Sequence, residues 1–244
     1  PRTGESPGPL PCAPVPPITA GMTAPMPPLP ILPDPAHPRL TRPVTGRDQT
    51  GAETEIRVVE ERPLTIWLNR REIVTAMTIG DYPEYLALGF LANQRMLRPG
   101  DQVTAGDFDD ETETVVVRTA TETDHEAKLA RRTRTSGCAV GTVFGDMMEG
   151  LEGLTLPPTL VRTSDLYALA QRINTLPSLY LEAGAIHGTV LCRGAEVMVY
   201  MEDVGRHNAV DKIAGFMRHH GVGGADKMLY TTGRLTSEMG IKCT

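Results

Sequence analysis

Prolines decide where this chain can fold. Fifteen of its 21 prolines fall within residues 1–43, in a stretch that includes PCAPVPPITAGMTAPMPPLPILPDPAHP. Proline has no backbone N–H and a fixed φ, so such a segment cannot supply the hydrogen bonds of a helix or an internal strand. We therefore expect residues 1–50 to form a disordered or extended Pro-rich tail, with the folded part beginning near residue 51.

Charge and hydropathy exclude several classes of protein. No apolar run approaches the roughly 20 residues that a bilayer requires, and the tail lacks the basic and apolar regions of a signal peptide. We expect a soluble, cytoplasmic protein with no membrane partner. The net charge of -6 argues against nucleic-acid binding by bulk electrostatics, although the RRTR run at 131–134 is a local basic patch.

The cysteines do not form a metal-binding pattern. They stand at positions 12, 138, 192 and 243, without a CxxC pair. This spacing favours neither a disulfide framework nor a zinc site, so we predict no metal. The chain begins without Met and stops at IKCT, just after an expected helix start, so we also expect its C-terminal part to be truncated.

Residues 51–130 have the pattern of a small α+β subdomain. Two β-rich runs flank the polar turn Asn69-Arg70, which indicates a hairpin. Pro83 follows Asp81-Tyr82, and apolar residues then recur at helical spacing, which predicts a helix over 81–97. The β-branched run TVVVRT predicts a further strand.

Residues 131–244 alternate strands and helices. Ser164 is a suitable N-cap for a helix over 164–174. HGTVLCRGAEVMVYME predicts two strands folded on Arg193-Gly194, and Ala209 to Met217 contain one apolar helical face. The strand KMLYTT and the helix start RLTSEMGIK follow. This order predicts a three-layer α/β domain behind the smaller subdomain.

The stretch EDVGRHNAVDKIAG, residues 202–215, places many polar side chains where a strand ends and a helix begins. Ligands bind at such points in α/β folds, because the helix N-terminus exposes unpaired N–H groups. Arg206, His207 and Asn208 are the candidates. The alternative is structural: Asp203 or Asn208 caps the helix, Arg206 pairs with an acid, and His207 is a buried, satisfied histidine.

The segment TTGRLTSEM, residues 231–239, repeats this arrangement. Arg234 with the hydroxyl groups of Thr236 and Ser237 would suit a phosphate or diphosphate. A plain capping box, with Glu238 near the third helical position, is the alternative.

Two further residues could carry chemistry. Cys138 stands in RRTRTSGCAVG, where nearby cations would lower the pKa of its thiol and glycines would let a ligand approach. An inert, buried thiol is the alternative, and we assign Cys12, Cys192 and Cys243 to that class. His187, which precedes a predicted strand, is a general acid or base, a ligand contact or a structural histidine.

Several stretches in this order resemble one family: DYPEYLALGFL, SGCAVG, GAIHGTVL, EDVGRHNAVDKIAG and TGRLTSEM. Together they are similar to the formate dehydrogenase accessory proteins of the FdhD type, which are sulfurtransferases. The resemblance runs from about residue 55 to 244 and leaves out the Pro-rich tail. It implies a main domain like that of cytidine deaminases but without zinc, and the chain indeed has no HxE with a downstream PCxxC.

The resemblance also implies a function. Such proteins accept sulfur from a cysteine desulfurase as a cysteine persulfide and pass it to the molybdenum bis(pyranopterin guanine dinucleotide) cofactor, before that cofactor enters formate dehydrogenase. Cys138 would be the carrier. The nucleotide, for which GDP is an analogue, would be held by polar residues of both helix starts and by His187: Arg206, His207, Asn208, Lys212, Arg234, Thr236 and Ser237. A homodimer is implied as well.

The chain departs from the family pattern at Gly141. Many members carry a second loop cysteine, spaced CxxC, where this chain has CAVG. A one-cysteine relay must therefore suffice, and two alternatives stay open. One is a chaperone that binds the molybdenum cofactor without handling sulfur, and the other is a metal-free nucleotide-binding module.

Overall fold

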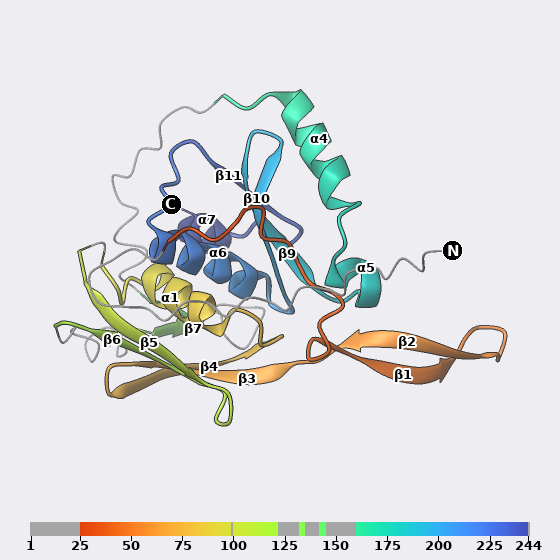
Figure 1. Ribbon diagram of the computed structural model, residues 1–244, viewed down its shortest axis with the longest axis horizontal. Helices are drawn as coiled ribbons and strands as arrows, with labels where there is room; N and C mark the ends of the chain where they lie inside the picture. Colours follow the sequence, from red (N-terminus) through yellow and green to blue (C-terminus); the bar gives the residue numbers. More distant parts are fainter. Residues whose placement is uncertain (1–24, 99, 122–131, 135–141, 145–159, 244) are drawn as a thin grey trace, which may run out of the picture.

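The computed structural model describes residues 25–98, 100–121, 132–134, 142–144 and 160–243 (Figure 1). These residues form a mixed α/β fold with several sheets. Two sheets lie on either side of a pair of helices that pack closely on each other, and a further helix covers the outer face of one sheet.

The first sheet belongs to the first half of the chain. It contains β3 (Arg62–Leu68), β4 (Arg71–Thr78), β5 (Val103–Asp109) and β6 (Thr114–Thr119), in the order β4-β3-β6-β5. Strands β3 and β6 are parallel and the other pairs are antiparallel. The predicted hairpin on Asn69-Arg70 and the strand TVVVRT are confirmed. Asn69 adopts φ 55°, a left-handed conformation that asparagine tolerates better than most residues.

Helix α1 (Pro83–Asn93) covers this sheet and is shorter than the predicted helix over 81–97. Tyr82 has φ 46° and lies outside the helix, while the chain after Asn93 continues as turns. Leu86, Phe90 and Leu91 pack with apolar residues of β3 and β6. Most of α1 is buried because the sheet lies on one side of it and another helix on the opposite side.

The second sheet belongs to the second half of the chain. It contains β9 (His187–Arg193), β10 (Glu196–Asp203) and β11 (Met228–Thr231), in the antiparallel order β10-β9-β11. Helix α6 (Arg206–His220) packs on one face and α4 (Thr163–Ile173) on the other, which gives this part of the molecule three layers. The short helices α5 (Leu179–Ala183) and α7 (Ser237–Lys242) complete it.

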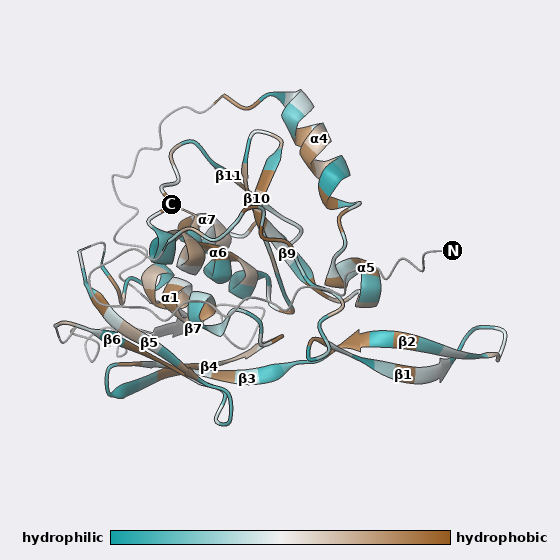
Figure 2. Ribbon diagram, in the orientation of Figure 1, coloured by the Kyte–Doolittle hydropathy of each residue, from teal (hydrophilic) through white to brown (hydrophobic). Residues whose placement is uncertain are grey.

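The two halves meet where α1 packs against α6. Tyr85 of α1 belongs to the same core cluster as Ile213 and Phe216 of α6, and the ring of Tyr85 contacts that of Phe216 edge to face. Figure 2 shows apolar stretches on both helices and on the strands that enclose them. The fold therefore packs α6, whose first residues are candidates for binding a ligand, against α1 on one side and the second sheet on the other.

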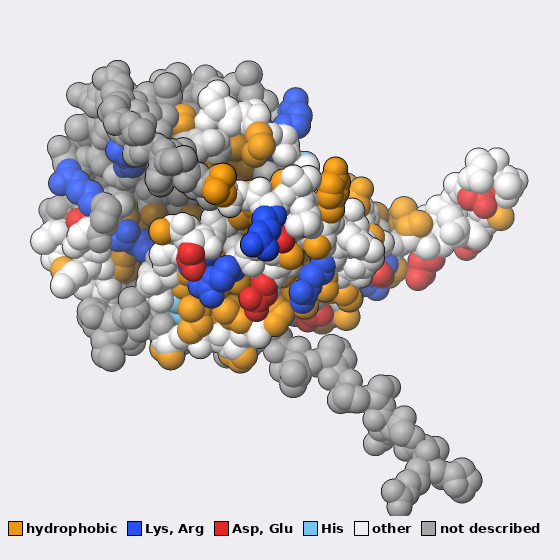
Figure 3. Space-filling model, turned by 90° about the horizontal axis from the view of Figure 1, so that it is seen from above, with side chains coloured by type: hydrophobic (Ala, Val, Ile, Leu, Met, Phe, Trp, Pro, Cys, Tyr) orange, Lys and Arg blue, Asp and Glu red, His pale blue; other side chains and the backbone are white. Residues whose placement is uncertain are grey.

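The predicted tail over 1–50 is wrong for its last part. Residues Thr41–Arg47 form strand β1, which pairs with β2 (Glu53–Val59) in a ribbon that projects from the body (Figure 3). Ile31 pairs with β10 at Val199, its N–H donating to the carbonyl oxygen of Met198 at 2.9 Å. Prolines thin out after residue 38, so the β-prone residues of β1 can pair. Residues 1–24 lie outside the described part of the chain.

Two short strands flank Cys138, the predicted sulfur carrier, in the sequence. β7 (Arg132–Arg134) pairs antiparallel with β8 (Thr142–Phe144), so Arg134 lies opposite Thr142. Elsewhere in the described ranges, none of the helices has the length and hydropathy needed to cross a bilayer.

Candidate functional site

The register of the second sheet brings three polar segments to one edge. Asp203, at the end of β10, pairs with His187 at the start of β9, and Thr231, at the end of β11, pairs with Thr189. Because both neighbours run antiparallel to β9, their carboxyl ends meet the beginning of β9. The start of α6, the turn after β11 and His187 therefore converge, and they carry three of the residues that the family resemblance implies for the nucleotide: His187, Arg206 and Arg234.

Arg206 lies in the centre of this edge. It is the first residue of α6 and only 8% of its surface is exposed. Its side chain lies on Gly233, where an added Cβ would come within 2.7 Å of the Cβ of Arg206. No ion pair of Arg206 with an acid is found among the described residues, and its Nε has no hydrogen-bond partner there. A buried guanidinium nitrogen without a partner indicates a ligand.

Two neighbouring side chains also hold buried polar atoms without a hydrogen-bond partner in the described part of the chain: Oγ1 of Thr236 and Nε2 of His207. Nε2 of His207 lies 3.3 Å from Oε2 of Glu238, but outside hydrogen-bonding geometry. Burial lowers the pKa of His207 to about 4, and the charges of Lys242 and Arg206 act in the same direction. His207 is therefore neutral near pH 7.

His187, Arg234 and Ser237 lie at the rim of this group. His187 is half-buried, and its pKa is lowered by burial and by the charges of Arg206 and Arg234. Arg234 and Ser237 are exposed. We call six of these residues the polar edge: His187, Arg206, His207, Arg234, Thr236 and Ser237.

Lys212 does not lie with the polar edge. Its side chain is fully buried and its Nζ lies 2.6 Å from Oδ2 of Asp203 and against Oδ1 of Asp81, while it donates to the carbonyl oxygen of Glu202 at 2.9 Å. The two carboxylates raise the pKa of Lys212 against the effect of burial. This lysine neutralises buried acids and joins β10 to the start of α1.

Asn208 also has structural partners. Its Nδ2 donates to the carbonyl oxygen of Met77 at 2.8 Å and to Oδ1 of Asp203 at 2.9 Å. Neither Asp203 nor Asn208 is the N-cap of α6, because the N-cap is Gly205, whose N–H donates to Oδ1 of Asp203. Asn208 thus has a structural role, although not the predicted cap, and the predicted ion pair of Arg206 with an acid is not found among the described residues.

The expected N-cap of α4 is wrong, and α7 lacks the hydrogen bond of a capping box although a threonine is its N-cap. Helix α4 begins after Arg162 rather than Ser164, and α7 has Thr236 as N-cap without a side-chain cap hydrogen bond. The hydroxyl of Thr236 is therefore not used by a capping box. It remains available to a ligand at the polar edge.

The cysteines differ in setting. Cys138 lies outside the described residues. Cys192 is buried in β9, its Sγ donates to the carbonyl oxygen of Met228 at 3.2 Å, and burial raises its pKa to about 11, which fits an inert thiol. Within the described ranges no group of three or more His, Cys, Asp or Glu is arranged to hold a metal ion.

The polar edge can bind an anion with several oxygen atoms. It combines two guanidinium groups, two hydroxyl groups and two imidazoles around a helix start, a set that suits phosphate groups and the polar edges of a base. Sequence reasoning missed the packing of Gly233 on Arg206 and considered Glu238 only as part of a capping box. The only signal for Gly233 was its place directly before Arg234 in the segment TTGRLTSEM.

Comparison with known proteins identifies relatives of this chain. The sulfur carrier protein FdhD of Listeria monocytogenes serotype 4b is 29% identical over 211 residues, which cover 85% of this chain and 80% of the relative. The protein of the same name from Bacillus subtilis is 28% identical over 193 residues, 78% and 74% of the two chains.

A solved structure has the same fold. The crystal structure of a protein from Desulfotalea psychrophila, assigned as a formate dehydrogenase accessory protein, superposes with a TM-score of 0.64 at 26% identity and covers 83% of this chain and 77% of that one. The FdhD/NarQ family model matches residues 59–244, which include all of the polar edge. The chain therefore belongs to the FdhD/NarQ family.

Proposed function

We propose that this protein is a sulfur carrier required for the activity of a formate dehydrogenase. The names of its relatives support this role. The observation that carries the proposal in this chain is the buried Nε of Arg206, which has no hydrogen-bond partner among the described residues, as is also the case for the hydroxyl of Thr236. Such a pair is costly in a free protein and is explained by a bound anion.

The ligand that we propose for the polar edge is the molybdenum bis(pyranopterin guanine dinucleotide) cofactor, bound as substrate, with GDP as its analogue. Arg206, Arg234 and the hydroxyl groups of Thr236 and Ser237 bind diphosphate oxygens. The neutral rings of His207 and His187 are available for hydrogen bonds to a base or sugar. Lys212 and Asn208 act indirectly, by fixing the start of α6.

Cys138 is the proposed catalytic residue. Its thiolate attacks the outer sulfur of a persulfide on a cysteine desulfurase, the sulfur–sulfur bond on that enzyme breaks, and the desulfurase thiolate leaves. Arginines 131, 132 and 134 precede Cys138 in the sequence and favour its anionic form. The product is a Cys138 persulfide, formed with no net oxidation or reduction.

Gly141 determines how the sulfur can leave. Release as sulfide requires a thiol to attack the inner sulfur and form a disulfide with Cys138. With Gly141 in place of a second loop cysteine, that thiol must come from outside the loop. Gly141 also keeps the second candidate function open, a chaperone that binds the cofactor and delivers it without carrying sulfur.

The first experiment is peptide mass spectrometry after incubation with a cysteine desulfurase and cysteine. We expect one added sulfur, removable by reductant, on the peptide that contains Cys138 and none on those of Cys192 or Cys243. The matched variant Cys138→Ala should lose the added sulfur and formate dehydrogenase activity in cells, while GDP binding is unchanged. Full activity with Cys138→Ala would support the chaperone instead.

A further inference from the structure

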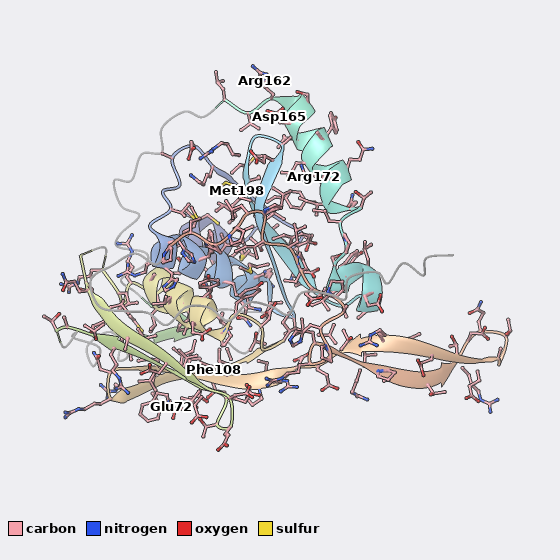
Figure 4. The ribbon with its side chains drawn as sticks, viewed as in Figure 1. Glu72, Phe108, Arg162, Asp165, Arg172 and Met198 are labelled. Carbon is pink, nitrogen blue, oxygen red and sulfur yellow. The ribbon has the colours of Figure 1, made fainter. Side chains whose placement is uncertain are left out.

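A cavity lies apart from the polar edge. It has a volume of about 370 Å³ and shares no lining residue with that site. Its walls come from residues 34–40, from the turn that leads into α1, from Arg62 on β3 and from the end of β5. Figure 4 labels Phe108, the β5 residue of this wall. Part of the cavity thus precedes residue 59, where the family match begins.

The cations of the cavity are already neutralised. Arg39 lies 2.6 Å from Asp110, and Arg62 lies 3.2 Å from Glu113, which is also 3.9 Å from Arg39. These pairs leave the two guanidinium groups little capacity to attract an anion. Asp81, which also lines the cavity, is paired with Lys212.

Two acids of the lining have no cationic partner. Asp34 and Glu84 take part in none of the ion pairs found among the described residues, and both are only partly exposed. Burial raises the pKa of Glu84. A ligand that brings a positive charge would remove the cost of keeping this carboxylate ionised.

The start of α1 does not favour an anion either. Pro83 has no N–H to donate, and Glu84 is an acid in the first turn, where it already meets the positive end of the helix dipole. The rest of the wall includes the apolar residues Leu40, Ile79 and Phe108, together with Tyr82 and the imidazole of His37. A ligand that fits these walls has a charged head and an apolar stem.

We propose that this cavity binds an organic cation, an alkyl-guanidinium or alkyl-ammonium group, whose charge is neutralised by Asp34 and Glu84 and whose stem contacts Leu40, Ile79 and Phe108. The arginine or lysine side chain of a partner protein and a free amine share this chemistry. The site is independent of the sulfur-carrier proposal, because none of its residues belongs to the polar edge.

Isothermal titration calorimetry with n-butylguanidinium tests the proposal, and n-butylurea is the uncharged control of nearly the same shape. We expect saturable binding of n-butylguanidinium, with a Kd on the order of 1 mM for so small a ligand, and none of n-butylurea. Glu84→Gln and Asp34→Asn should each weaken binding about tenfold, the loss of one charged contact. Asp226→Asn, at a surface acid outside the cavity, should have no effect.

Three results would overturn the proposal: equal binding of n-butylurea, unchanged affinity in the Glu84→Gln, Asp34→Asn double variant, or displacement of n-butylguanidinium by inorganic phosphate. Thermal unfolding of each variant, compared with the parent, checks that the cavity is intact. Arginine with its α-amino and α-carboxyl groups blocked is titrated as a further ligand. Binding at least as tight as that of n-butylguanidinium identifies a partner's side chain, and much weaker binding identifies a free amine.

Discussion

Gly89 of α1 lies directly against the backbone of Asp211 in α6: a Cβ on Gly89 would be 1.7 Å from the carbonyl oxygen of Asp211. The contact is reciprocal, since a Cβ on Gly215 of α6 would be 1.8 Å from the carbonyl oxygen of Tyr85. Two glycines therefore allow the helices to touch along their backbones. This contact holds α6, and with it Arg206, against the first sheet.

We predict that Gly89→Ala and Gly215→Ala each lower the free energy of unfolding by at least about 3 kcal/mol, because the helices must separate to admit a methyl group. Urea denaturation measures the change. Gly46→Ala is the matched control, since nothing lies within 4 Å of a Cβ at that position. A loss of less than about 1 kcal/mol at both helix positions would show that the contact is looser than described.

The packing of Gly233 on Arg206 predicts a defect in binding without the loss of a charge. Gly233→Ala places a methyl group 2.7 Å from the Cβ of Arg206 and must shift the guanidinium. We expect the Kd for GDP to rise about tenfold, equivalent to one charge-assisted hydrogen bond of about 1.5 kcal/mol. Arg206→Ala should weaken GDP binding at least as much, and Gly240→Ala, with open space around it, should not. Unchanged GDP affinity in both variants would place the nucleotide elsewhere.

Lys212 should act on stability rather than on a ligand. Lys212→Met leaves Asp203 and Asp81 buried without their cation, and we predict a loss of about 3–5 kcal/mol in the free energy of unfolding. Under conditions where the variant is folded, its GDP affinity should stay within about threefold of the parent's, since Lys212 has no exposed surface. A stable variant that cannot bind GDP is the contradicting result.

Glu202 gives a pH dependence with a definite sign. Its carboxylate accepts hydrogen bonds from the N–H groups of Leu179, at 2.7 Å, and Tyr180, at 3.2 Å, while burial raises its pKa to about 7 from 4.5. The carboxyl group of Glu202 therefore binds a proton more tightly in the native state than in the unfolded state. The contribution of Glu202 to stability is full below pH 4.5, declines as the pH rises to about 7, and is constant above.

We therefore expect Glu202→Gln to flatten the decline of unfolding free energy between pH 4.5 and 7. The difference between parent and variant over this range should approach about 3 kcal/mol. Chemical denaturation at a series of pH values measures it, with Glu196→Gln, on the exposed end of β10, as the control. Parallel pH profiles of parent and Glu202→Gln would contradict the prediction.

The low pKa of His207 can be tested by NMR. Its ring should stay neutral down to about pH 4, because burial and the charges of Lys242 and Arg206 oppose protonation. A titration of histidine ring protons, assigned with His207→Gln, should show no step for His207 near pH 6.5. Such a step would indicate a solvated ring and a more open polar edge.

Local sequence patterns predict most of the helices and strands and the residue types at the strand ends. Hairpin Asn69-Arg70, the strands on either side of Arg193-Gly194 and the helix after Arg206 follow from turn residues and periodicity, which act over a few residues. The family resemblance, rather than any local pattern, grouped Arg206, Thr236 and His187 at one site; the residues alone indicated only that polar side chains stand at strand ends and helix starts. The role of Cys138 stays a prediction.

Long-range packing determines which cations of α6 are paired with acids and which are not. Arg206 and Lys212 are both cations in α6, six residues apart, yet Arg206 keeps an unpartnered nitrogen at the polar edge while Lys212 is enclosed by acids from β10 and from the turn before α1. The difference depends on Asp81, which is more than 100 residues away in the sequence. Long-range packing of α1 on α6 creates this pairing, and no local pattern encodes it.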